Sequence, residues 1–168
     1  MVLMHPEQRL DALSECFIHA LFQAFPQWMS LAREVDSGNG LRHIEVDIPQ
    51  EGATRHLNLS TATGNITITF DGWHTHVGPF LGMNERECAA MAITIIDSFI
   101  TENTVVVVET RDGKWVGSRL EYLDAPSAND PTCMNHVYSW RGTHDRVQLP
   151  VGKDHRVNNQ HNQSQPGK

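Results

Sequence analysis

Apolar residues recur every three or four positions in the N-terminal part of the chain, as they do along one side of a helix. The stripe consists of Leu10, Leu13, Phe17, Ala20, Leu21, Ala24, Trp28 and Leu31. Pro26 lacks the backbone N–H that a helix interior needs, so we expect the helix to bend or end near residue 25. Residues 27–35 then form either its continuation or a second short helix.

A second helix is predicted from residue 84 onward. Asn84 is a suitable N-cap, and Glu87 stands at the position of its reciprocal partner in a capping box. The apolar residues of this segment cover more than half of the helix surface, which indicates deep packing. They are Ala89, Ala92, Ile93, Ile96, Phe99 and Ile100.

Between these two helices, apolar and polar residues alternate as in half-buried strands. The pattern is clear in 41–48 and again from residue 66, and it is weaker in 55–60. Three antiparallel strands in succession are the expected outcome.

The segment after the second helix predicts further strands. The continuous apolar run 105–108 is typical of a central strand that is covered on both faces. Asp112-Gly113 predicts a hairpin turn, so that 114–122 returns beside the run, and 136–141 has the pattern of a last short strand.

The resulting order, α-β-β-β-α-β-β-(β), predicts an α+β fold. We expect a mainly antiparallel sheet of five to six strands packed with two main helices. Residues 1–150 are expected to form a single α+β domain. Residues 151–168 are polar and have almost nothing to bury, so we expect a disordered tail.

Charge is spread unevenly over the 168 residues, whose formal net charge is −7. Residues 1–130 hold 8 Lys/Arg and 18 Asp/Glu, whereas 131–168 hold 5 and 2. An acidic body argues against a nucleic-acid partner, which needs basic side chains for its phosphates. It favours a basic protein partner, or it simply keeps the chain soluble.

Targeting and redox signals are weak. The first ten residues do not form a signal peptide, and no run approaches the length of a membrane span, so we expect a cytoplasmic protein with no membrane partner. Three cysteines, Cys16, Cys88 and Cys133, lie far apart, which argues against a disulfide framework and a thiolate zinc site.

The densest cluster of candidate functional residues is Asp71-Gly-Trp-His-Thr-His76. His74 and His76 lie two apart, so on a strand their rings point to the same side, a spacing that can hold a metal ion. A third ligand could come from His144 or Asp145. The alternatives are ordinary hydrogen-bonded histidines or a polar and aromatic contact surface.

The conformation at Gly72 decides which side chains of this cluster face the core and which face solvent. Continued alternation from residue 66 would bury both histidines and expose Trp73. Because unpaired histidines are costly to bury, we expect a bulge at Gly72 that turns Trp73 inward and His74 and His76 outward.

Two further clusters carry residue types that are common in binding sites. In the first, which contains Trp140, Arg141, His144 and Asp145, Arg141 could pair with Asp71 or Asp145. In the second, Trp115 and Arg119 are expected on the same face of a strand, and both residue types are enriched in binding hot spots.

Motifs for nucleophilic or phosphate chemistry are missing from the sequence. No serine lies in a Gly-x-Ser-x-Gly elbow, and no Gly-rich phosphate loop occurs. Cys133 has only His136 nearby in sequence, without an orienting third group. Binding without catalysis and without a cofactor is therefore the expectation.

Three segments together resemble small bacterial immunity proteins of polymorphic toxin systems, of the contact-dependent inhibition and Rhs types. They are Phe70-Asp-Gly-Trp-His-Thr-His76, Asp112-Gly-Lys-Trp-Val-Gly-Ser118 and Ser139-Trp-Arg-Gly-Thr-His-Asp145. The resemblance spans about residues 41–146. It implies a protein that neutralises a cognate toxin by binding it inside the producing cell, with no cofactor.

The leading hypothesis is thus an immunity-type protein, with a small metal-dependent hydrolase that uses the His-x-His pair as the alternative. The toxin and the oligomeric state stay open. The candidate partner-binding residues are Asp71, Trp73, His74, His76, Trp115, Arg119, Trp140, Arg141, His144 and Asp145.

Overall fold

The N-terminal apolar stripe forms helix α1 (Ala12–Ala24) in the computed structural model, which describes residues 9–38, 41–50 and 55–151. The Asp11 side chain caps the helix by accepting a hydrogen bond of 2.7 Å from the Ser14 backbone N–H. The helix ends at Phe25, directly before Pro26, as predicted.

The chain after Pro26 differs in part from the expectation. Residues Pro26–Leu31 form a short 3-10 helix, η1, but Ala32–Asp36 form strand β2 instead of continuing as a helix. Strand β2 pairs antiparallel with β3 (Leu41–Pro49), and its Arg33 lies 3.3 Å from Glu45 across the pair. This pairing is tertiary, so no local periodicity could reveal it.

Six strands form sheet A. They are β1 (Arg9–Leu10), β2, β3, β4 (His56–Ser60), β5 (Ile66–Phe70) and β6 (Trp73–Val77). The main order is β1-β3-β4-β5-β6, with β2 also on β3, and all pairs except β1–β3 are antiparallel.

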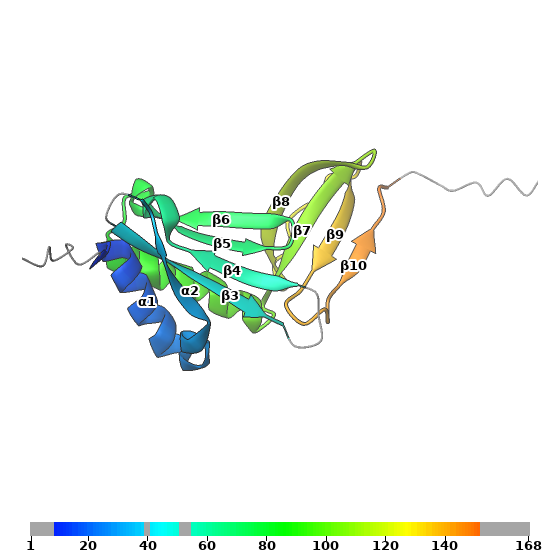
Figure 1. The fold of residues 1–168 in the computed structure, drawn as a ribbon. Coiled ribbons are helices and arrows are strands. Elements are labelled where there is room, and N and C mark those ends of the chain that lie inside the picture. The colour runs from blue at the N-terminus through cyan, green and yellow to red at the C-terminus, as the bar shows by residue number, and fades with distance from the viewer. Residues whose placement is uncertain (1–8, 39–40, 51–54, 152–168) are drawn as a thin grey trace, which may run out of the picture.

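One face of sheet A packs on α1 and on α2 (Glu85–Ile100), so the predicted alternation is confirmed (Figure 1). The side chains on this face are almost completely buried. They are Ile44, Val46, Ile48, Leu57, Leu59, Ile66, Ile68, Phe70, Trp73 and Val77.

The β5–β6 connection is a two-residue turn at Asp71-Gly72, where Asp71 has φ of 51°. Phe70 therefore pairs directly with Trp73, and both are buried. The predicted orientation is confirmed, with Trp73 inside and His74 and His76 outside. Its cause is a hairpin turn and not the expected bulge.

Helix α2 begins as predicted. The Asn84 side chain accepts from the Glu87 backbone N–H at 3.0 Å, and the Glu87 carboxylate accepts from the Asn84 N–H at 2.8 Å. These two bonds satisfy backbone donors that a helix start otherwise leaves unpaired.

Sheet B contains four antiparallel strands in the order β10-β9-β7-β8. They are β7 (Thr104–Arg111), β8 (Lys114–Tyr122), β9 (Met134–Tyr138) and β10 (Arg146–Gln148). As predicted, the valines of β7 are buried on both faces. Val106 and Val108 join the core that sheet A shares with the helices, while Val105 and Val107 pack with Val137.

The predicted Asp112-Gly113 turn joins β7 to β8, and both residues have positive φ, 50° and 75°, as a type I′ hairpin turn requires. The α+β class is confirmed, but the strands are divided between two sheets and not gathered in one. The expected tail lies outside the described residues from 152 onward. No described helix is long and apolar enough to cross a membrane.

The capping box of α2 generates a stability prediction. Replacing Asn84 by Ala removes the acceptor for the Glu87 N–H and should lower the free energy of unfolding by about 1 kcal/mol. Asn84→Asp restores an acceptor and should stay close to the original protein. Urea denaturation of the three proteins measures the effect, and equal stability of all three would show that the cap contributes nothing.

Candidate protein-binding site

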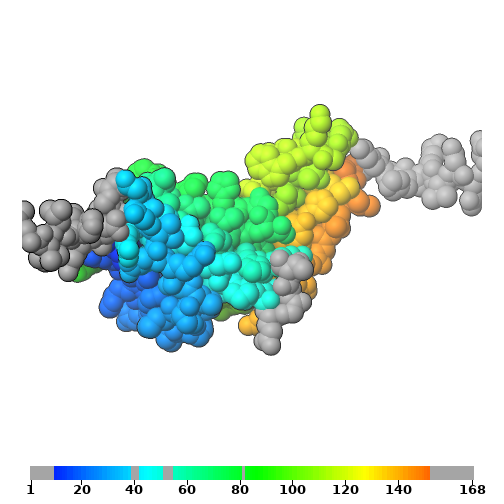
Figure 2. All heavy atoms as spheres, viewed as in Figure 1, coloured from blue at the N-terminus to red at the C-terminus, as the bar shows by residue number. Residues whose placement is uncertain are grey.

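Sheet A leaves one broad face without a helix over it, and we call this the open face (Figure 1). Its side chains are polar, and Figure 2 shows the atoms of β3–β6 on the viewed side of the molecule, between β2 and sheet B. The open face consists of His43, Glu45, Asp47, His56, Asn58, Ser60, Thr67, Thr69, His74 and His76.

Interactions between side chains on the open face are local. His56 Nδ1 lies 3.0 Å from Asp47 Oδ1, and His43 Nε2 lies 3.6 Å from Glu45 Oε1. The His56–Asp47 pair is exposed, and pairs of this kind contribute little to stability. These side chains can therefore exchange their partners when another molecule covers the face.

His74 and His76 lie side by side on the edge strand β6, with ring centroids 5.2 Å apart. His76 Nδ1 is 3.0 Å from Thr67 Oγ1 and 3.2 Å from Asn65 Oδ1. The expected third ligand is not there, because Asp145 binds Arg55. Within the described residues, no three His, Cys, Asp or Glu side chains come together in a way that could hold a metal ion.

The end of the β5–β6 hairpin meets sheet B around Arg55. Arg55 Nη2 lies 2.6 Å from Asp145 Oδ2, its Nε lies 3.8 Å from Asp71 Oδ2, and its guanidinium carbon is 4.7 Å from the Tyr138 ring centroid. The Arg55 side chain is 25% exposed, so the pairs are partly shielded from water. Arg55 thereby ties β4, the β5–β6 turn and the segment after β9 together.

Ionisation at this junction follows from that geometry. Burial alone would raise the pKa of Asp145, but hydrogen bonds from Arg55 and from the Ser139 backbone outweigh it and hold that pKa below its ordinary value. Burial and the Asp71 carboxylate raise the pKa of Tyr138. Asp145 is thus a charged carboxylate at neutral pH, and its oxygens are engaged in hydrogen bonds that stabilise the fold.

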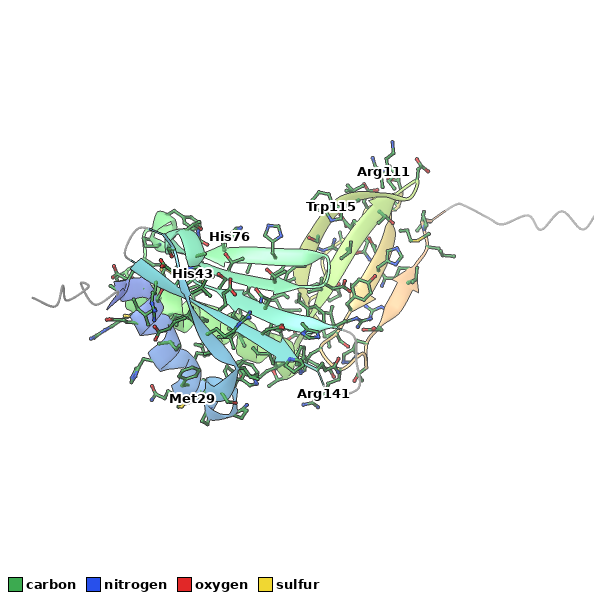
Figure 3. The ribbon with its side chains drawn as sticks, viewed as in Figure 1. Met29, His43, His76, Arg111, Trp115 and Arg141 are labelled. Atoms are coloured by element: carbon green, nitrogen blue, oxygen red, sulfur yellow. The ribbon has the colours of Figure 1, made fainter. Side chains whose placement is uncertain are left out.

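The expected pairing of Arg141 with Asp71 or Asp145 is wrong, since Arg55 takes both carboxylates. The Arg141 backbone N–H instead donates to Glu102 Oε1 at 2.7 Å, and its side chain projects away from the fold (Figure 3). Burial opposes ionisation of Glu102, yet this bond and those from Thr143 and Ser139 lower its pKa.

Two other residues of the same segment have structural positions. The Trp140 ring packs on Phe70 and Phe99, with centroids 6.0 and 6.1 Å away. The His144 backbone N–H donates to Ser139 Oγ at 3.0 Å. The segment 139–145 is therefore a supporting loop behind the junction.

A register shift between Glu109 and Thr110 separates Trp115 from Arg119. Trp115 pairs with Thr110 and shares its face, whereas Arg119 pairs with Val107 on the other face. The expectation that both residues share one face is therefore wrong, because a local bulge reverses the alternation.

Arg119 lies between two carboxylates on its face. It contacts Glu109 and lies 2.9 Å from Glu121, and it also donates to Asn129 at 2.7 Å. Burial lowers the pKa of Arg119, but the bonds to Glu121 and Glu109 outweigh that effect and raise it. Arg119 is a structural cation under the loop that precedes β9.

Trp115 is 64% exposed and stands on the part of sheet B that extends past the start of β6 (Figure 3). On the same face a pocket of about 390 Å³ opens beside the β7–β8 turn. The residues that line it are Thr110, Asp112, Gly113, Thr132, Met134, His136, Leu149 and Pro150. We call Trp115 together with this pocket the ledge.

The predicted site residues thus fall into separate groups. His74 and His76 lie on the open face, Trp115 is on the ledge, and Asp71 with Asp145 belongs to the junction between them. Trp73 is 6% exposed and supports the sheet from inside.

Arg55, Glu102 and Glu109 were missed from the sequence. Their partners are 10 to 90 positions away in the chain, and no short motif surrounds them. Only their residue types, charged groups next to apolar strands, could have drawn attention to them.

Comparison with models of known protein families, with curated proteins and with solved structures finds no match for this chain.

The junction generates a pH-dependent prediction. Arg55→Met keeps the aliphatic length but removes the charge, and should lower the free energy of unfolding by about 1–3 kcal/mol at neutral pH. The folded pKa of Asp145 is depressed, so this stabilisation is complete above the ordinary Asp pKa of about 4 and is lost as pH falls through the folded value. Urea denaturation at neutral pH and near pH 3 should show the gap narrowing in acid.

Arg33→Met is the matched control, because the Arg33–Glu45 pair is exposed. It should change stability by less than about 1 kcal/mol at either pH. If the two variants behaved alike, the junction would carry no special stabilisation.

Proposed function

We propose that this chain neutralises a bacterial toxin by direct binding, as an immunity protein does, and that the toxin covers the open face and the ledge. The observation that carries the proposal is the uncovered face of sheet A, which ends beside a strongly exposed tryptophan on sheet B. The likeness of three segments to immunity proteins supports it, since Asp71, His74, His76 and Trp115 come from those segments.

The surface has the composition of a protein-binding site. Tryptophan is among the residues that carry most of the energy in such interfaces, usually where it enters a pocket or faces one. The ledge offers both an exposed ring and a pocket of about 390 Å³ that can receive a side chain of the partner. The histidines, threonines and amides of the open face supply a polar surround that can form adaptable hydrogen bonds.

Charge favours a basic toxin surface. The net charge is −7, and Arg55 and Arg119 each lie between two carboxylates and neutralise only one of the two charges. Each cluster therefore keeps a net negative charge. Complementary charge speeds association, while a few anchors such as Trp115 supply affinity.

The metal-dependent hydrolase is the weaker alternative. Its proposed third ligand, Asp145, is held by Arg55 at 2.6 Å, and the His144 backbone is tied to Ser139 in the supporting loop. A hydrolytic site needs ligands that leave an activated water fixed in place. The described residues offer only the histidine pair for that purpose.

The first test uses the protein encoded beside the gene for this chain. The proposal expects that protein to be toxic when produced alone, to form a one-to-one complex with this chain, and to be harmless when both are produced together. A neighbouring product that is harmless and does not bind would refute the proposal.

The second test places the binding surface. Trp115→Ala should weaken the complex by roughly 30-fold, about 2 kcal/mol, because it removes an exposed anchor without opening the core. Phe80→Ala is the matched control, since Phe80 is 66% exposed but belongs to η3 (Pro79–Leu81), which follows the other end of β6. Titration calorimetry with both variants measures the difference. Equal effects would place the toxin elsewhere on the molecule.

A further inference from the structure

The two histidines of β6 are fixed on one side of the strand. Their neighbours Trp73 and Val77 are buried, so the strand cannot rotate to hide the rings or to separate them. The ring centroids are 5.2 Å apart, with an angle of 67° between the ring planes. Two imidazoles that share a tetrahedral metal at about 2.0–2.1 Å also have centroids roughly 5 Å apart.

A chain of hydrogen bonds determines which nitrogen of His76 carries the proton. Thr63 donates its hydroxyl to the Ala62 carbonyl at 2.6 Å, so Thr63 Oγ1 must accept from Asn65 Nδ2 at 3.2 Å. The Asn65 amide is thereby oriented with Oδ1 toward His76.

Asn65 Oδ1 can only accept hydrogen bonds. Thr67 donates its hydroxyl to this oxygen at 3.0 Å, so Thr67 Oγ1 is itself an acceptor toward His76 Nδ1, 3.0 Å away. His76 Nδ1 is then the donor to both Thr67 Oγ1 and Asn65 Oδ1, the latter at 3.2 Å. His76 therefore holds its proton on Nδ1 and presents the lone pair of Nε2. Metal-binding histidines have the same arrangement, with the second nitrogen held by a hydrogen bond that fixes the tautomer and the ring.

We infer that His74 and His76 form a binding site for a first-row divalent transition metal ion, with Zn²⁺ and Cu²⁺ as the best-suited ions. Neutral imidazole prefers these ions over Mg²⁺ or Ca²⁺. Asn65 and Thr67 position His76 for this purpose. The inference does not depend on toxin binding.

The site has two protein ligands and open coordination positions. Among the described residues no third His, Cys, Asp or Glu joins the pair, so water or a side chain from another molecule completes the shell. The ion is consequently exchangeable and lies on the open face, where a bound partner could reach it.

The other two histidines of the open face make a natural comparison. His56 interacts with Asp47, and His43 lies near Ser37 and Glu45. Neither has a second histidine on its own strand two positions away. His56 shares the exposure of the β6 pair without its geometry, whereas the His43 side chain is only 12% exposed.

The experiment follows Cu²⁺ binding to the full chain by NMR, because a paramagnetic ion broadens the signals of nearby nuclei. At substoichiometric Cu²⁺ we expect broadening centred on β6 and on Thr67. His74→Ala with His76→Ala should abolish it, while His56→Ala should leave it unchanged. Both histidines of the pair are exposed, so these substitutions leave the core intact, and the unbroadened spectrum confirms folding.

Zn²⁺ affinity measured by calorimetry tests the positioning role. Asn65→Ala should weaken Zn²⁺ binding by about 10-fold, because His76 loses the acceptor that fixes its tautomer. Broadening centred on the tail histidines His155 and His161, or undiminished binding in the double variant, would overturn the site. Unchanged affinity in Asn65→Ala would overturn the role given to Asn65.

Discussion

Burial of one face of sheet A against α1 and α2 is the constraint on which the other features depend. Since the side chains of a strand alternate, fixing the aliphatic residues inside also fixes every polar neighbour outside. The turn at Asp71-Gly72 continues this constraint into β6, where Trp73 and Val77 are drawn into the same core. The position of the two β6 histidines is therefore a consequence of core packing.

Sheet B is attached to this core through a different kind of contact. Val106 and Val108 enter the shared apolar cluster, while Arg55 joins β4 to Asp71 and Asp145 at the margin. Apolar burial supplies most of the stabilisation, and the charged contacts define how the hairpin meets the second sheet. The segment after β9 takes part in these contacts, which explains why Trp140 and Asp145 face inward.

Features that depend on neighbouring residues were predictable from the sequence. The capping box of α2, the valine run of β7 and the Asp112-Gly113 turn each have a local physical signal, and all three are present. Features that depend on pairing between distant strands were not. Strand β2 forms because it can pair with the edge of β3. The register shift between Glu109 and Thr110, which leaves Val116 as an extra residue in β8, moves Trp115 to the face opposite Arg119. Arg55 was missed for the same reason, because its partners come from other parts of the chain.

The register shift near Val116 also affects whether two copies of this protein can associate through the edge strand β8. Among the described strands, β8 pairs only with β7, so its nine residues carry unpaired backbone donors and acceptors along one side. Such an edge is a template on which a further strand can add and start aggregation. The extra residue twists the beginning of β8, and Lys114 places a charge there. The bulge that exposes Trp115 thus makes β8 a poor template for a strand from another copy of this protein.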